Sequence, residues 1–81
     1  MRVVSDDLFA IYVYSEAMHK HHLPHCHVRS PDGEIVVILP TLSVLVGGKL
    51  SKRAKSLLLE NIDQICEAWN KLNPEIETTH E

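Results

Sequence analysis

The chain of 81 residues lacks the features that mark several large classes of protein. It has only two cysteines, Cys26 and Cys66, which do not supply the disulfide framework of a small secreted domain. The N-terminus lacks the basic and then apolar layout of a signal peptide, and no apolar run approaches the roughly 20 residues that span a bilayer. We therefore expect a protein of the reducing cytoplasm that makes no use of a membrane.

The chain also lacks a net positive charge. Its formal net charge is −3 with the histidines neutral, so nucleic acid is not attracted overall and any such binding needs a local patch. A hydrophobic content of 44% with 23% charged residues argues against extended disorder and indicates a folded domain. We expect a single domain over residues 1–81, with an ordered core at about 8–73 and a frayed tail at 74–81.

Four segments favour β-strands. Bulky and β-branched residues dominate 8–14, and the segments 25–30, 34–39 and 41–46 are bounded by turn residues. Pro31-Asp32-Gly33 is typical of a tight turn, because Pro presets its own φ and Gly tolerates a positive φ. It predicts a hairpin between the second and third segments.

The segment after Gly47-Gly48 is predicted to be a helix with Ser51 as its N-cap. Apolar residues recur there at spacings of one, three and four, and form one face: Ala54, Leu57, Leu58, Ile62, Ile65, Cys66, Trp69 and Leu72. Asn and Asp at 61–63 favour caps, but the pattern continues through them, so we expect one helix with at most a kink. The predicted fold is a small α+β domain, an antiparallel sheet of three to four strands with a C-terminal helix packed on one face.

The strand at 34–39 is apolar on both of its faces. A half-exposed strand would alternate instead, and a single helix covers only one face of a sheet. We therefore expect the second face to contact a small partner protein or a second copy in a homodimer. The alternative is that the N-terminal loop folds over this face.

Five of the six histidines lie within nine positions, and they are His19, His21, His22, His25 and His27. On a strand, His25 and His27 share one face at about 6.6 to 7 Å, while Cys26 and Val28 face the core. With His21 or His22 as a third nitrogen, these histidines could bind a divalent metal such as zinc and leave one position open. Glu16 or Glu34 could orient the rings.

A second interpretation of the histidines needs no metal. His21, His25 and His27 could exchange protons with RNA during cleavage through its 2′-hydroxyl, since imidazoles titrate near neutral pH. Phosphate would then bind to the basic residues around the helix start: Lys49, Lys52, Arg53 and Lys55. A third interpretation is structural, with histidines that bond across the sheet and a solvated basic face.

Two motifs carry a resemblance to a known family: His21 followed by Pro24-His25-Cys26-His27-Val28, and Gly48-Lys49-Leu50-Ser51-Lys52-Arg53-Ala54. The chain resembles a family of short bacterial proteins classed as a domain of unknown function. Its members carry an acidic residue, His, any residue and Pro-Pro-His-Phe-His-Val, then Gly-Lys-Leu-Pro-x-Arg-Ala before a helix that ends near a Trp. The resemblance covers most of residues 8–72.

The resemblance implies a function only in outline. Such proteins are often encoded beside a second small protein and are treated as halves of toxin–antitoxin-like pairs. The pattern gives weight to the same six residues: His21, His25, His27, Lys49, Lys52 and Arg53. Lys20, Leu23 and Cys26 depart from it, and the loss of the acid at Lys20 removes a carboxylate that could orient a histidine.

These observations lead to one hypothesis and one alternative. The hypothesis is the toxin-like half of a two-gene module that acts on RNA through the histidines and the basic helix start. We expect the site where those two features meet. The alternative is a non-catalytic metal-binding or protein-interaction module, so the residues leave open whether the protein is an enzyme.

Overall fold

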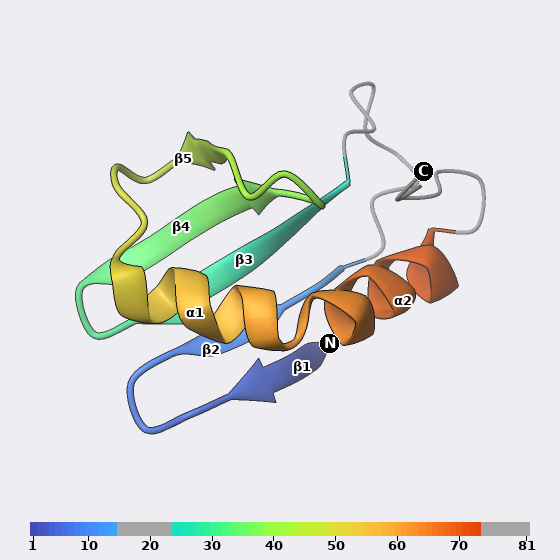
Figure 1. The fold of residues 1–81 in the computed structure, drawn as a ribbon, viewed down its shortest axis with the longest axis horizontal. Coiled ribbons are helices and arrows are strands. Elements are labelled where there is room, and N and C mark those ends of the chain that lie inside the picture. Colours follow the sequence, from blue (N-terminus) through green and yellow to red (C-terminus); the bar gives the residue numbers. More distant parts are fainter. Residues whose placement is uncertain (15–23, 74–81) are drawn as a thin grey trace.

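The computed structural model describes residues 1–14 and 24–73, and these form an antiparallel sheet followed by two helices (Figure 1). The elements in chain order are β1 (Arg2–Ser5), β2 (Ala10–Tyr12), β3 (His25–Ser30), β4 (Gly33–Ile38), β5 (Val44–Val46), α1 (Lys52–Glu60) and α2 (Ile62–Leu72). The five strands lie in the order β1-β2-β3-β4-β5, and each pairs antiparallel with its neighbour. The predicted α+β class is confirmed.

The sheet has five strands, whereas three to four were expected. The strand that was not predicted is β1, which has four residues and pairs with β2 through an irregular register. Asp6 makes the connection between them, since its Oδ1 accepts hydrogen bonds from the backbone N–H groups of Leu8 at 2.8 Å and Phe9 at 2.6 Å. These bonds to the ionised form lower the pKa of Asp6.

The expectation of one C-terminal helix is wrong, because Asn61 divides the helical segment in two. The Asn61 side chain donates from Nδ2 to the carbonyl of Leu57 at 2.9 Å, and its backbone N–H donates to Leu58 at 3.2 Å. Such side-chain bonds compete with helical continuation. The carbonyl of Asn61 then accepts from Ile65, which starts α2. The helix break at Asn61 therefore interrupts the hydrogen-bond ladder without moving the apolar face.

The core lies between the sheet and the two helices, which cross the same face of the sheet in Figure 1. Its fully buried members include Ile11, Val37, Leu58 and Trp69. Cys26 has no exposed surface and Cys66 is also buried, as the alternation and the helical pattern predicted. Burial, with a smaller effect of Cys66, raises the pKa of Cys26 to about 12. The thiol is therefore protonated at neutral pH and serves as a packing group.

The second face of the sheet lies away from α1 and α2, and bears Tyr12, His25, His27, Arg29 and Val36. Tyr12 pairs in register with His27, and His27 with Val36, so one row of side chains crosses three strands. Val36 and Ile38 are half-buried and do not belong to the cluster packed against the core. That a partner covers this face stays a prediction. Within the described ranges, neither helix is long and apolar enough to cross a bilayer.

Gly47 and Gly48 provide a test of how closely β5 approaches β4. Both have positive φ, +108° and +98°, which strains any other residue. A Cβ on Gly47 would lie 2.5 Å from the carbonyl oxygen of Glu34, whereas one on Gly48 would meet nothing within 4 Å. We expect Gly47→Ala to lose about 1–3 kcal/mol more of the free energy of unfolding than Gly48→Ala. Urea titration measures this difference, and equal losses would contradict the close approach.

Candidate functional site

β3 brings His25 and His27 together on the second face. Their ring centroids lie 5.3 Å apart with an angle of 65° between the planes, and both rings are half-buried. His27 also meets the edge of Tyr14 at 5.0 Å, and His25 lies 5.1 Å from Trp69 of α2. His25 is the first residue of β3, where the sheet ends and a helical side chain can reach it. Each ring of the pair therefore has one further aromatic neighbour.

Glu34 holds His27 in place. Its Oε2 lies 3.3 Å from Nδ1 of His27, and its Oε1 accepts from Nε of Arg29 at 2.9 Å. Arg29 and, to a smaller extent, His27 lower the pKa of Glu34, and the same hydrogen bond raises the pKa of Arg29. A carboxylate next to Nδ1 favours the tautomer with its proton on Nδ1 and the lone pair on Nε2. That Nε2 is shielded from solvent.

Glu34 is one of the two carboxylates proposed from the sequence to orient a histidine. The other, Glu16, and the histidines His19, His21 and His22 lie outside the described residues. Lys20, where the family pattern has an acid, lies outside them too. The lack of an acid at position 20 does not leave His27 without a carboxylate, because Glu34 supplies one from the neighbouring strand.

Arg29, Tyr12 and Tyr14 extend the site along the second face. The guanidinium carbon of Arg29 lies 4.8 Å from the centroid of the Tyr12 ring, a cation–π arrangement. The rings of Tyr12 and Tyr14 are nearly parallel, with centroids 6.1 Å apart. Sequence reasoning missed this group as functional. The alternation of side chains along the strand could have identified Arg29, because it puts Arg29 on the face of His25 and His27. The tyrosines could not be added without knowing that β2 pairs with β3.

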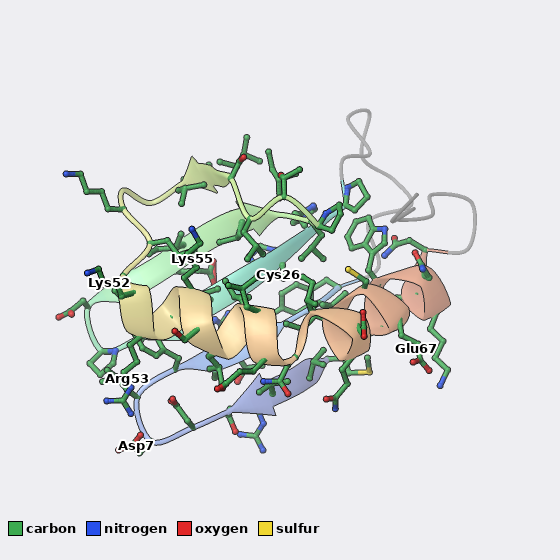
Figure 2. All side chains as sticks on the ribbon, in the orientation of Figure 1. Asp7, Cys26, Lys52, Arg53, Lys55 and Glu67 are labelled. Atoms are coloured by element: carbon green, nitrogen blue, oxygen red, sulfur yellow. The ribbon has the colours of Figure 1, made fainter. Side chains whose placement is uncertain are left out.

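The basic residues Lys49, Lys52, Arg53 and Lys55 surround the start of α1, and three of them are labelled in Figure 2. Ser51 caps this helix as predicted, since its hydroxyl accepts from the N–H of Ala54 at 3.2 Å. Arg53 hydrogen-bonds Asp7 and lies 3.6 Å from Asp6, so its charge is partly balanced. Lys49 and Arg53 line a cavity of about 460 Å³ between the start of α1 and the turn after β3.

That the histidines meet the basic helix start stays a prediction, because His21 lies outside the described residues. The cavity beside Lys49 and Arg53 is lined by Ser30, the last residue of β3, and by Glu34, whose carboxylate contacts His27, whereas His25 is the first residue of β3. Five residues of extended chain span about 17 Å. The histidines also lie on the second face, whereas α1 packs on the other. The described part of the candidate site consists of His25, His27, Glu34 and Arg29.

The metal interpretation concerns His21, His25 and His27, of which the structure places two. Within residues 1–14 and 24–73, no group of three or more His, Cys, Asp or Glu side chains is arranged to hold a metal ion. A site completed by His21 stays a prediction. The arrangement of Glu34 on Nδ1 of His27 suits it, because metal-ligating histidines usually donate their other N–H to a carboxylate or carbonyl.

The lowered pKa of Glu34 predicts a pH-dependent contribution to stability. Its carboxylate stabilises the fold above its ordinary pKa of 4.5, and this contribution is lost as the pH falls through the lowered value. Glu34→Gln should therefore be less stable than wild type at about pH 7 and should approach it at about pH 3. Urea titrations at both pH values measure this. Glu67→Gln, an exposed carboxylate of α2 labelled in Figure 2, is the control, and the same pH dependence in both variants would contradict the pairing.

Comparison with known proteins gives one match. The sequence model of a family described as Domain of unknown function (DUF4160) matches residues 9–70, which include β2, β3, β4 and most of the helical layer. A search of curated proteins found no match, and a search of solved structures found none either.

Proposed function

Since the chain belongs to this family of domains of unknown function, whose description states no activity, we propose a function from the site itself. The protein is the toxin-like half of a two-gene module, and it acts on RNA through the histidines of β3. The observation that carries the proposal is the contact of Glu34 with His27, beside His25, on a face that also bears aromatic rings and a guanidinium.

The proposed reaction is cleavage of RNA through its own 2′-hydroxyl. The 2′-oxygen attacks phosphorus, the bond from phosphorus to the 5′-oxygen breaks, and a cyclic phosphate and a 5′-hydroxyl result. One group takes the proton from the 2′-hydroxyl and another gives a proton to the leaving 5′-oxygen. No other atom or electron is needed, so the reaction requires only two groups that titrate near neutral pH.

We assign the histidines different roles in this reaction. Nε2 of His27 is shielded from solvent and Nδ1 faces Glu34, so His27 acts as a positioning residue. His25, in ring contact with His27, is the histidine that exchanges a proton with the substrate. In this proposal His21 is the second proton-transfer group. Lys49, Lys52 and Arg53 then bind the RNA backbone several nucleotides away from the reacting phosphate.

The partner of the module belongs to the same proposal. The second face is half-buried and apolar at Val36 and Ile38, beside the site. A small partner protein, or a second copy of this chain, that bound there would cover the histidines and exclude RNA. Such a contact would keep the activity silent until the partner is lost.

The RNA proposal is tested by substitution of one histidine of β3 and one basic residue at the start of α1. His25→Ala should lower the rate of cleavage of a single-stranded RNA by about 100-fold or more, because a positioned acid or base contributes that much. Arg53→Ala should weaken cleavage less, through substrate binding. Gel analysis of labelled RNA and growth of expressing cells are the measurements, with circular dichroism to verify folding.

His80→Ala is the matched control, because it removes the one histidine outside the 19–27 stretch. It should cleave RNA at the wild-type rate. If the variant that combines His25→Ala with Arg53→Ala is as active as wild type, the proposal is refuted.

A second candidate function is favoured by the contact of Glu34 with His27, which also suits a metal ligand. The protein would then be a metal-binding or protein-interaction module, with His21, His25 and His27 around a divalent ion such as zinc. The purified protein should carry near-stoichiometric metal by elemental analysis, and His27→Ala should lose it. Glu34→Gln should bind it about 10–100-fold more weakly. Protein that is metal-free and cannot be reloaded would reject this candidate.

A further inference from the structure

Arg29 is an exposed cation whose guanidinium is held in place from two sides. Nε donates to Glu34 at 2.9 Å, and the guanidinium lies over the Tyr12 ring at 4.8 Å. Its side chain nevertheless keeps 54% of its surface exposed. The two Nη groups make no hydrogen bond within residues 1–14 and 24–73. The guanidinium plane is therefore fixed before any ligand arrives, while four N–H donors remain available.

We propose that Arg29 binds a phosphate of single-stranded RNA on the second face, with Tyr12 and Glu34 as the residues that hold it in position. A planar guanidinium matches two phosphate oxygens at once, and a fixed one loses less side-chain entropy on binding. The inference rests on the proposed function for its choice of RNA. In this inference, the phosphate contact nearest the histidines lies on β3. The basic residues at the start of α1 contact the RNA backbone farther away.

The position of Arg29 fits a phosphate next to the reacting one. Arg29 follows His27 by two residues on the same face of β3, a distance of about 7 Å along the strand. Arg53 is as exposed as Arg29, at 54%, but it is paired with two carboxylates, Asp6 and Asp7, and lines the cavity at the start of α1. Arg29 is thus the cation that the described structure places beside His25 and His27.

The negative charge of Glu34 does not block this use of Arg29. Its Oε1 accepts from Nε of Arg29 and its Oε2 faces Nδ1 of His27, so both oxygens point at partners within the sheet. The two Nη groups together form the end-on edge of the guanidinium, which is a different edge from the one that Nε presents to Glu34. The aromatic rings of Tyr12 and Tyr14 add surfaces on which bases of a single strand stack.

The experiment measures binding separately from cleavage. A fluorescent single-stranded RNA with 2′-O-methyl groups cannot react through its 2′-oxygen, and anisotropy gives its dissociation constant. Arg29→Lys keeps the charge but loses the planar pair of donors, so we expect binding to weaken about 10-fold. Arg29→Gln should reduce the dependence of log affinity on log salt concentration by about 0.7, the value for one lost phosphate contact.

Two further variants separate recognition from general effects. Lys71→Gln, on the last turn of α2, removes one positive charge elsewhere and should bind within about 2-fold of wild type. Tyr12→Leu keeps Arg29 but removes the ring beneath it, and should weaken binding about 3- to 10-fold. Urea titration verifies that each variant is folded.

The outcomes distinguish this inference from the proposed function. Weaker binding by Arg29→Lys supports it, even if the wild-type protein cleaves no RNA. Wild-type affinity in Arg29→Lys overturns it, while the cleavage assay still decides the proposed function. An oligonucleotide that fails to bind wild type also overturns it. The inference is also overturned if Arg29→Lys changes the oligomeric state and leaves the RNA affinity unchanged, because the second face would then be a protein interface.

Discussion

The packing of Cys26 and Val28 against the helical layer is the constraint on which the rest of the structure depends. Both side chains are buried beneath α1 and α2, and this fixes which face of β3 each residue occupies. His25, His27 and Arg29 then have to lie on the second face, since side chains alternate along a strand. A slip of one residue would bury the histidines and expose the apolar pair. The hydrophobic core therefore determines the composition of the candidate site.

The sequence predicted the fold wherever a local pattern decided it, and failed where distant residues decided. β3 was predicted at its observed bounds, and the turn that joins it to β4 predicted the hairpin that brings Glu34 opposite Arg29. β1 was missed, since its place in the sheet depends on its pairing with β2. The helix break at Asn61 was missed because the apolar face continues past it. For the candidate site, period-two alternation was enough to pair His25 with His27. Tyr12 joins them only through the register of β2 with β3, and the position of α1 relative to β3 depends on packing.

The hydrogen bonds of Glu34 explain why two different chemistries suit one site. A carboxylate on Nδ1 of a histidine fixes the ring and its tautomer, which both a metal ligand and a positioned catalytic histidine require. The other oxygen of Glu34 binds Arg29, whose remaining donors favour an anion. One acidic residue on β4 thus couples the histidine pair to the cationic end of the second face. The two candidate functions differ in whether a metal ion binds Nε2 of His27 or an RNA substrate reaches the ring of His25.

The helix break at Asn61 has a consequence for how the protein folds. α1 has nine residues and α2 has eleven, both below the roughly 12–15 residues at which isolated helices become marginally stable in water. Neither helix persists unless its apolar face is packed on the sheet. Among residues 1–14 and 24–73, the helices are the elements that cover Ile11, Cys26 and Val37. We therefore expect helices and strands to form in one cooperative transition, without a populated intermediate that contains only the helices.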